Sequence, residues 1–257
     1  MKKRNVLITG AGSGIGRSVA LKFAAEGADI IVVGRSEKKL TAVCREIDEL
    51  GGSSLAVQAD VSSDSDMKKA FVAVSERWDR IDVLFANAGI NGMWAPIEDI
   101  TVEEWDLTHD INMKGTFLTV KYAIPLMKEH GGAIVIDSSV NGTRVFANRG
   151  TSCYGSSKAA QAAFGKFAAV ELARYRIRVN VVCPGATVTD IDDHMSERNI
   201  EDLTLWSEFP NGNPPLSQGE WANADQVADA VMYLAGEGAS HITGVELHID
   251  GGTSLIT

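Results

Sequence analysis

Short apolar segments alternate with longer amphipathic segments along most of this chain. Seven of the short segments are almost continuously apolar and predict strands: Val6–Thr9, Ile30–Val33, Leu55–Gln58, Val83–Ala86, Ala133–Asp137, Arg178–Val182 and Glu246–Ile249. Strands without regular polar alternation are typical of a parallel sheet that is covered on both faces. The pattern therefore predicts an α/β fold around a parallel sheet of about seven strands.

The segments between these strands predict the covering helices. They are Gly16–Glu26, Glu37–Leu50, Ser65–Trp78, the long and kink-compatible Val102–Met127, Ser152–Arg174 and Asp225–Leu234. The 257 residues fit one large α/β domain, and no repeat, low-complexity tract or linker divides them. We predict a single doubly wound Rossmann-type domain over residues 1–257.

One segment, Val188–Glu220, interrupts this alternation. It is polar, rich in proline and glycine, and it contains the aromatic residues Trp206 and Phe209. Long irregular segments in compact domains are often functional loops. We therefore predict that residues 188–220 form a substrate lid, with a purely structural insertion as the alternative.

Charge and cysteine content exclude several classes of function. The net charge of −10 disfavours nucleic acid and anionic membrane surfaces as partners, and no apolar run approaches membrane-spanning length. Cys44, Cys153 and Cys183 lack disulfide or metal spacing, and the five histidines are scattered, with only His194 placed to meet a substrate in the predicted lid. The start of the chain lacks the apolar core of a signal peptide. We expect reduced thiols, no metal site and a cytoplasmic protein.

The first predicted strand runs directly into a glycine-rich loop. The sequence from residue 9 is Thr-Gly-Ala-Gly-Ser-Gly-Ile-Gly, and a predicted helix follows at once. Glycines in this position let backbone N–H groups approach a pyrophosphate, whose charge the helix N-terminus then stabilises. We expect a dinucleotide to contact Gly10, Ser13, Gly14, Ile15 and Gly16.

The second predicted strand ends without the carboxylate that would hold a ribose diol. The sequence there is Gly34-Arg35-Ser36. Arg35 has the guanidinium geometry that suits a 2′-phosphate, and Ser36 follows it directly. We predict NADP(H) in preference to NAD(H); the alternative is that Arg35 is a solvated surface residue.

A phenol and an ammonium lie four residues apart at Tyr154 and Lys158. On a helix both side chains project from the same face. A nearby ammonium favours the phenolate and lowers the pKa of a tyrosine. Tyr154 would then exchange a proton with a carbonyl or alcohol oxygen near neutral pH.

Together these motifs resemble those of the short-chain dehydrogenase/reductase family over nearly the whole chain. The further matching elements, in the family's order, are Asp60 and Val61, Asn87-Ala88-Gly89 with Ala86 replacing the family's first asparagine, Asn112, Ser138-Ser139, Pro184-Gly185 with Thr189, and Asp250-Gly251-Gly252. The resemblance implies a nicotinamide-dependent oxidoreductase acting on CH–OH groups.

The resemblance also implies a role for each matching residue. Tyr154 would be the general acid and base, and Lys158 would depress its pKa and hold the nicotinamide ribose. Ser139 would hydrogen-bond the substrate oxygen, and Asn112 would position a water in a proton relay. The remaining cofactor contacts would come from Asp60 and Val61, from Asn87, Ala88 and Gly89, and from Pro184, Gly185, Thr187 and Thr189.

The chain departs from the family pattern around the serine. Ser139 precedes Tyr154 by fifteen residues, where the family more often shows thirteen, so that Asn141–Cys153 carries a short insertion. We prefer Ser139 to Ser138 because Val140-x-Gly142 follows it and only one of two adjacent strand residues faces the site. Asp137 is unusual at an apolar position, and we interpret it as a hydrogen-bonded carboxylate at the edge of the sheet.

The substrate is less constrained than the cofactor. Trp94, Asn141, Phe146 and Trp206 are expected near the substrate, which would be a small carbonyl or secondary alcohol. Reduction of 3-oxoacyl groups on acyl carrier protein and a non-catalytic cofactor sensor stay as alternatives, and a sugar epimerase or dehydratase is disfavoured by the short chain and the glycine spacing.

The predicted helix after Tyr154 contains many small residues. In this it resembles family members that pair such helices between subunits, which implies a homotetramer.

Overall fold

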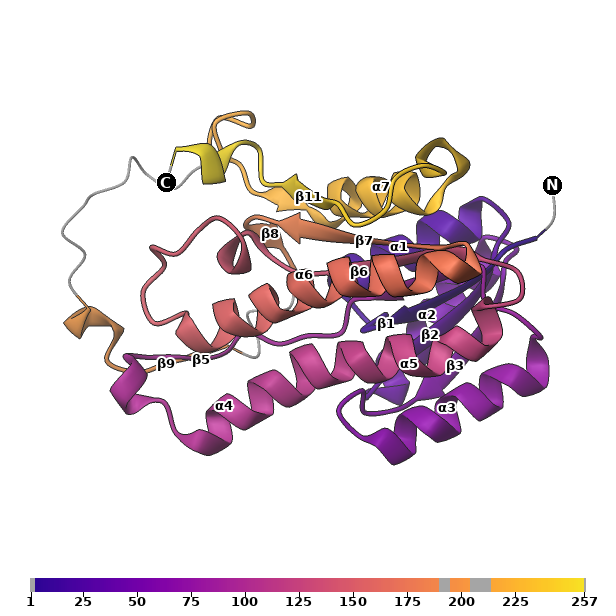
Figure 1. Cartoon of the computed structure of the whole chain (residues 1–257), viewed down its shortest axis with the longest axis horizontal. Coiled ribbons are helices and arrows are strands. Elements are labelled where there is room, and N and C mark those ends of the chain that lie inside the picture. Colours follow the sequence, from indigo (N-terminus) through magenta and orange to yellow (C-terminus); the bar gives the residue numbers. More distant parts are fainter. Residues whose placement is uncertain (1–2, 190–194, 204–213, 257) are drawn as a thin grey trace.

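A seven-stranded parallel sheet forms the centre of the computed structural model, which describes residues 3–189, 195–203 and 214–256 (Figure 1). Its strands are β1 (Asn5–Thr9), β2 (Asp29–Gly34), β3 (Ser53–Gln58), β4 (Val83–Ala86), β6 (Gly132–Asp137), β7 (Ile177–Pro184) and β11 (Glu246–Ile249). Their order across the sheet is β11-β7-β6-β4-β1-β2-β3. The predicted fold class is confirmed.

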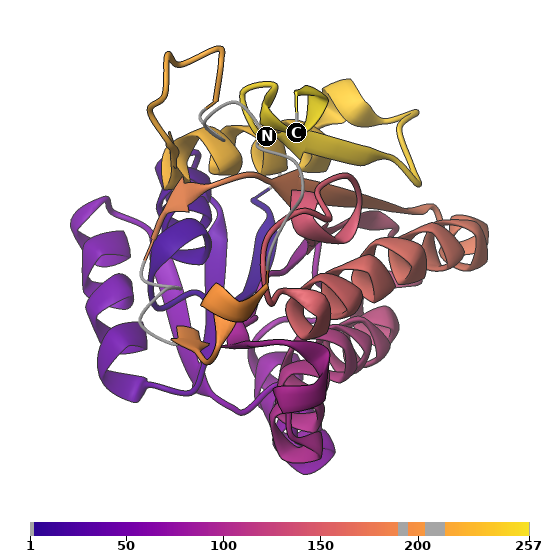
Figure 2. The same cartoon turned by 90° about the vertical axis from the view of Figure 1, so that its left-hand side faces the viewer.

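Helices cover both faces of this sheet (Figure 2). They are α1 (Gly14–Ala25), α2 (Glu37–Glu49), α3 (Asp64–Arg77), α4 (Val102–His109), α5 (Gly115–Met127), α6 (Ser152–Leu172) and α7 (Ala224–Ala235). One apolar core joins α1, α2 and α7 to the sheet, and a second joins α3, α5 and α6 to its other face. Burial of both faces explains why the strands are apolar throughout.

The order in which strands are added across the sheet reverses at β1: β2 and β3 extend the sheet on one side, and β4 then begins the other side. Strand β1 pairs in parallel with β2 on one side and with β4 on the other. The connections that follow β1 and β4 therefore leave in opposite directions, and a crevice opens between them at the carboxyl ends of the strands. Every loop that carries a predicted cofactor residue begins at the carboxyl end of a strand, on this side of the sheet.

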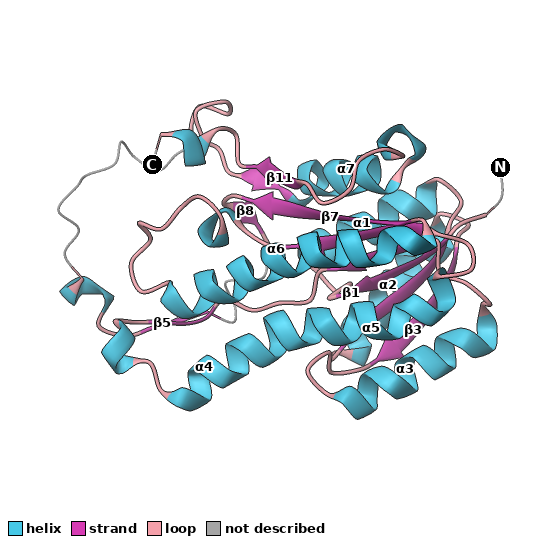
Figure 3. Cartoon of the chain, in the orientation of Figure 1, coloured by secondary structure: helices cyan, strands magenta, loops and turns pink. Residues whose placement is uncertain are grey.

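The predicted long helix Val102–Met127 has a defined interruption. Helix α4 passes into a π-helical turn at Asp110–Lys114, and α5 continues from Gly115 (Figure 3). Turns of this kind are frequent at functional sites because they shift the direction of the side chains that follow. Asn112 lies at the centre of the turn and is fully buried.

The predicted lid is attached to the body of the protein at both of its ends. Strand β9 (Met195–Glu197) pairs with β5 (Gly92–Trp94). Strand β8 (Thr187–Val188) pairs with β10 (Ala222–Asn223). Arg198 also donates hydrogen bonds to the Asp99 carbonyl oxygen and to Glu104. Residues 190–194 and 204–213 of the segment, which include His194, Trp206 and Phe209, lie outside the described residues, so the lid stays a prediction.

Several small residues of α6 pack against the protein's own sheet. A Cβ on Gly165 would lie 2.5 Å from Val181 Cγ2 of β7, and Ala162, Ala168 and Ala169 are buried beside it. These residues thus allow a close helix–sheet contact within one chain, and the homo-oligomer expected from the small residues of this helix stays a prediction. Across the described ranges, no helix is both long and apolar enough to cross a bilayer.

Gly165→Ala should destabilise the protein although alanine is the better helix former. The new methyl group would overpack a rigid core contact with Val181, and we expect the free energy of unfolding to fall by about 1–3 kcal/mol in urea denaturation followed by circular dichroism. The control is Ala163→Gly, at an exposed position of the same helix, which should cost about 1 kcal/mol through propensity alone. A more stable Gly165→Ala protein would contradict the close packing.

Candidate active site

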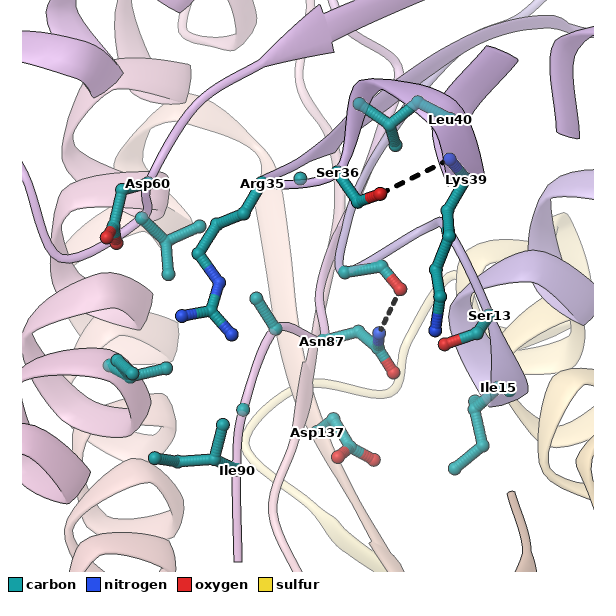
Figure 4. Close-up of a pocket in the computed structure, with 18 of the residues that line it drawn as sticks. Ser13, Ile15, Arg35, Ser36, Lys39, Leu40, Asp60, Asn87, Ile90 and Asp137 are labelled. Atoms are coloured by element: carbon teal, nitrogen blue, oxygen red, sulfur yellow. Dashed lines mark hydrogen bonds between the residues drawn. The ribbon is translucent and has the colours of Figure 1, made fainter. Parts of the chain in front are cut away.

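A cavity of about 480 Å³ lies at the carboxyl ends of the strands, in the crevice beside β1 (Figure 4). Twelve of the predicted cofactor residues line it: Gly10, Ser13, Gly14, Ile15, Arg35, Ser36, Asp60, Val61, Asn87, Ala88, Gly89 and Thr189. The loops after β1, β2, β3 and β4 all contribute to this wall. The fold therefore assembles one cavity from motifs that are far apart in the sequence.

The glycine loop closes tightly against the turn after β4. Gly10 has a φ of +67°, and a Cβ there would lie 2.7 Å from Asn87 Nδ2. A Cβ on Gly16 would also lie 2.7 Å from Asn87 Nδ2 and closer still to the Gly10 carbonyl oxygen. Gly16 does not line the cavity; instead, it lets the loop fold back so that the N-terminus of α1 meets the cavity at Ser13 and Gly14.

Hydrogen bonds hold this arrangement in place. Thr9 Oγ1 accepts bonds from the backbone N–H groups of Asn87 (3.1 Å) and Ala88 (3.2 Å). In return, Asn87 Nδ2 donates to the carbonyl oxygens of Thr9 (3.0 Å) and Gly10 (3.3 Å). The Asn87-Ala88-Gly89 motif is thus fastened to the end of β1, which fixes one side of the cavity.

The connection from β2 to α2 and the first turn of α2 each supply one cation to the cavity. Ser36 caps α2 by accepting a hydrogen bond from the backbone N–H of Lys39 at 3.4 Å, so the helix begins directly after Arg35. Both Arg35 and Lys39 line the cavity, and Figure 4 shows their side chains extending the same way. The sequence analysis missed Lys39, although a basic residue in the first turn after β2 was a usable signal.

The loop after β3 contributes Asp60. Burial alone would raise the pKa of its carboxyl group, but hydrogen bonds from Ser62 Oγ (2.7 Å) and N (2.9 Å), with the charges of Arg35 and Lys114, hold that pKa below its usual range. Asp60 is therefore an ionised acceptor at neutral pH. It lies beside the Arg35 side chain in Figure 4.

The predicted phenol and ammonium are close together and buried. Tyr154 and Lys158 lie one turn apart on α6, and Lys158 Nζ is 5.7 Å from the centre of the Tyr154 ring. The exposed fractions are 7% for Tyr154 and 1% for Lys158. Neither side chain lines the cavity. Gly89 does line it, and a Cβ on Gly89 would lie 3.5 Å from Lys158 Nζ.

Asp137 holds the ammonium of Lys158. Lys158 Nζ donates to the Asp137 carbonyl oxygen at 3.0 Å and lies 3.3 Å from Asp137 Oδ2. Burial opposes the charged form of Lys158, but the charges of Asp137 and Tyr154 outweigh it and raise the pKa of the ammonium. The expected edge position for Asp137 was wrong: it ends β6, an interior strand between β4 and β7, because the β4–β6–β7 pairings enclose it.

The two adjacent serines after β6 have different environments. Ser138 Oγ donates to the Lys158 carbonyl oxygen at 2.7 Å and is buried against α6. Ser139 Oγ instead accepts a hydrogen bond from the backbone N–H of Asn141 at 3.2 Å. The Ser138 hydroxyl hydrogen is thus committed to the helix, whereas no described group accepts the hydrogen of Ser139.

The Asn112 side chain connects three elements. Its Nδ2 donates to the Ile90 carbonyl oxygen (3.0 Å) and to Ser157 Oγ (2.9 Å), and its Oδ1 accepts from the Ile90 N–H (2.9 Å). Both amide hydrogens are therefore used in holding the loop after β4 against α6. The predicted role in a proton relay stays a prediction.

The residues after β7 lie behind the cavity, apart from Thr189. Gly185 N donates to the Ile249 carbonyl oxygen at 3.0 Å, and Thr187 Oγ1 donates to the Gly185 carbonyl oxygen at 3.0 Å. Pro184 is the last residue of β7, and these three do not line the cavity. Thr189 does line it, with its Cβ 3.2 Å from where a Cβ on Gly14 would lie.

A second cavity, of about 450 Å³, contains two of the predicted substrate residues. Asn141 and Phe146 line it together with Gly155 and Ser156 of α6, and Asn148 Nδ2 donates to Asn141 Oδ1 at 2.7 Å. The insertion between Ser139 and Tyr154 therefore forms a wall of this cavity. Trp94 lies in β5 next to a lining residue, Ala95, and does not itself line either cavity.

Comparison with known proteins agrees with the fold and the motifs. The family model described as Enoyl-(Acyl carrier protein) reductase matches residues 10–254. Levodione reductase from Leifsonia aquatica is 36% identical, over 98% of this chain and 94% of the relative. The chain belongs to the short-chain dehydrogenase/reductase family. As a member of this family of oxidoreductases it binds a nicotinamide cofactor.

Two solved structures show how closely this short-chain dehydrogenase/reductase follows its relatives. A 3-ketoacyl-ACP reductase from Sinorhizobium meliloti superposes with a TM-score of 0.93 at 42% identity, covering 98% of this chain and all of that one (100%). A 3-ketoacyl-(acyl-carrier-protein) reductase from Brucella melitensis, complexed with NADH, has a TM-score of 0.85 at 31% identity and covers 98% of each chain.

The cysteines of this short-chain dehydrogenase/reductase are unpaired, and two of them are buried. Burial raises the pKa of the Cys183 thiol to about 12, and burial also raises the pKa of Cys153. Reaction with an alkylating agent requires the thiolate and access to it. Among the described residues, no three His, Cys, Asp or Glu side chains come together as a metal site would need.

Iodoacetamide at pH 8 should therefore modify Cys44 in the native protein and leave Cys153 and Cys183 unmodified. Cys44 is only half-buried, whereas a pKa of about 12 leaves roughly one Cys183 thiol in ten thousand ionised at that pH. Peptide mass spectrometry measures the modification at each site, and a denatured sample, in which all three react, is the control. Rapid native modification of Cys183 would contradict its burial.

Proposed function

We propose that this protein is an NADP(H)-dependent reductase and dehydrogenase that interconverts a carbonyl compound and a secondary alcohol, with Tyr154 as general acid and base. The observation that carries the proposal is the buried pair of Tyr154 and Lys158 beside a cavity built from the glycine loop. A phenol next to a buried ammonium suits proton exchange near neutral pH, which the reaction requires.

The cavity suits a dinucleotide in shape and in donor set. The glycine loop leaves the N-terminus of α1 open to it at Ser13 and Gly14, where backbone N–H groups would hold the pyrophosphate. Asp60 and Val61 would contact the adenine, while Asn87, Ala88 and Gly89 would line the path toward the nicotinamide ribose. Lys158 and Tyr154 would bind that ribose, and Pro184–Thr189 would face the carboxamide.

The preference for NADP(H) rests on Arg35 in the β2–α2 connection and Lys39 in the first turn of α2. Arg35 and Lys39 line the cavity, and no carboxylate lies between Gly34 and Ser36 to hold a free 2′-hydroxyl. A guanidinium with a second cation nearby would compensate the charge of a 2′-phosphate. The Brucella melitensis relative contains NADH, so the preference depends on these side chains rather than on the fold.

Tyr154, Ser139 and Lys158 would each have a different role in the reaction. The bound cofactor supplies the hydride, which reaches the carbonyl carbon during reduction. As the C=O bond breaks to a single bond, Tyr154 donates its phenolic proton to the oxygen, and the Ser139 hydroxyl hydrogen-bonds the developing negative charge. The Lys158 ammonium stabilises the resulting phenolate, and the reverse sequence oxidises the alcohol.

A 3-oxoacyl thioester on acyl carrier protein is the second candidate substrate. It is favoured by the Sinorhizobium meliloti relative, whose name gives this activity. However, cations that could receive an acidic carrier, Lys128, Arg174 and Arg176, follow α5 and α6 at the end of the sheet opposite the cavity. The net charge of −10 also disfavours an acidic carrier. We therefore place a free carbonyl substrate first.

Assembly into a homotetramer and a cytoplasmic location are part of the proposal. The exposed side of α6 carries Phe167 (71% exposed) and Val170 (79% exposed), which a second subunit would cover. Three unpaired cysteines suit a reducing compartment.

The second cavity, which Asn141 and Phe146 line, would receive the part of the substrate beyond its reacting carbonyl group.

Tyr154→Phe should lower kcat/KM by about 10²- to 10⁴-fold, because the proton donor is removed while the ring is kept. NADPH and NADH oxidation would be measured against ketones, 3-oxoacyl thioesters and sugars, with cofactor binding measured separately by fluorescence titration. Cofactor binding should weaken by at most about 10-fold, through loss of the Tyr154 hydroxyl's contact with the ribose, so the variant still binds both cofactors. Activity close to that of the parent protein would refute the role of Tyr154.

The adjacent serines provide a matched control for this experiment. Each variant should lower the free energy of unfolding by about 1 kcal/mol, because Ser139 loses the bond from the Asn141 N–H and Ser138 the bond to the Lys158 carbonyl oxygen. Only Ser139→Ala should also lower turnover, because the substrate oxygen loses a donor. A loss of turnover in Ser138→Ala but not in Ser139→Ala would identify Ser138 as the substrate contact.

Arg35→Ala should weaken NADPH binding by about 10- to 100-fold and NADH binding far less, because a charged hydrogen bond to phosphate is worth about 1.5–3 kcal/mol. Lys39→Ala should show the same selectivity with a smaller loss. Arg45→Ala, an exposed site on α2 with the same change of charge, is the control. Equal losses for both cofactors would show that the predicted preference for NADP(H) is wrong.

A further inference from the structure

Asp137 is a buried carboxylate that the proposed mechanism does not use. It is the last residue of β6 and is 8% exposed. Its side chain lines the cavity beside β1, away from Ser36 and Leu40 (Figure 4).

The two oxygens of this carboxylate differ in their partners. Oδ2 lies 3.3 Å from Lys158 Nζ, while Oδ1 is shielded from solvent and has no hydrogen-bond partner among the described residues. A buried carboxylate oxygen without a donor is costly, and the cost is offset when a ligand supplies the donor. Because Asp137 faces the cavity, the missing donor is expected from whatever occupies it.

The Lys158 ammonium restricts what this donor is. An ammonium has three N–H groups and no acceptor, and Asp137 takes two of them through its carbonyl oxygen and Oδ2. One N–H is left for a ligand oxygen. A hydroxyl group that accepts this N–H still has its own hydrogen to donate, and Asp137 Oδ1 is the acceptor available beside it.

We propose that Asp137 is a cofactor-binding residue, whose Oδ1 accepts a hydrogen bond from a hydroxyl of the nicotinamide ribose while Oδ2 holds Lys158. The proposal rests on the function proposed above, in which Lys158 binds that ribose. Burial raises the pKa of the Asp137 carboxyl group, and the neighbouring Lys158 ammonium opposes this by favouring the ionised form. The contact adds an acceptor to the donor that Lys158 provides, so that both the oxygen and the hydrogen of one hydroxyl are bound. The alternative is that Asp137 Oδ1 accepts a hydrogen bond from the carboxamide N–H₂ of the same cofactor. The experiment below distinguishes the ribose hydroxyl from the carboxamide.

The variant Asp137→Asn isolates this contact. An asparagine keeps the size of the side chain and one oxygen for Lys158, but it presents an N–H₂ group where Oδ1 was. Binding of NADPH, ADP-ribose and ADP would be measured by calorimetric titration, after thermal melting has established that the variant is folded. ADP-ribose contains the second ribose without nicotinamide, and ADP contains neither.

Asp137→Asn should weaken the binding of NADPH and ADP-ribose by about 10- to 100-fold and leave that of ADP unchanged. Asp60→Asn, at a carboxylate in the adenine part of the same cavity, is the matched control and should weaken all three ligands. A loss confined to NADPH would assign Asp137 to the carboxamide and overturn the ribose contact. Equal losses for all three ligands, or none, would overturn it as well.

The parent protein offers a test that does not depend on a folded variant. ADP-ribose analogues that each lack one hydroxyl of the terminal ribose should include one that binds at least about 10-fold more weakly than ADP-ribose. Equal binding of all analogues would overturn the proposal. A parent protein that bound neither NADPH nor NADH would instead refute the proposed function, so the two failures are distinguishable.

Discussion

The parallel pairing of β1 with β2 on one side and β4 on the other is the constraint on which the site depends. It makes the following loops diverge and leaves a crevice at the carboxyl ends of the strands. Thr9 then ties both sides together, because its hydroxyl and carbonyl groups bind the Asn87-Ala88 turn. The glycine loop and the Asn87 motif are thus two sides of one cavity rather than separate features.

The burial of Lys158 is the second constraint. A buried ammonium is stable only when acceptors surround it, and the end of β6 supplies both a carbonyl oxygen and a carboxylate through Asp137. Helix α6 reaches this position because Gly165 permits a close approach to β7. Packing of small residues far from the chemistry therefore determines where the Tyr154–Lys158 pair lies.

Much of the fold could be predicted because it follows from local patterns. Apolar runs of strand length and the glycine loop have the same meaning in any sequence, and all seven predicted strands occur in the sheet. The π-helical turn at Asp110–Lys114 was not predicted, since its bonds differ from those of an α-helix by one residue and leave no hydrophobic signature. The β5–β9 pair was missed because it joins segments about a hundred residues apart.

The amino-acid sequence by itself determined the strand and helix order, the phosphate loop and the one-turn spacing of Tyr154 and Lys158, because these depend on residues that are close in the chain. Only the tertiary structure decided that Ser138 binds the backbone of α6 and that Asp137 meets Lys158 with one oxygen left over. These contacts join distant segments, and their partners are known only when the sheet has placed the ends of its strands side by side.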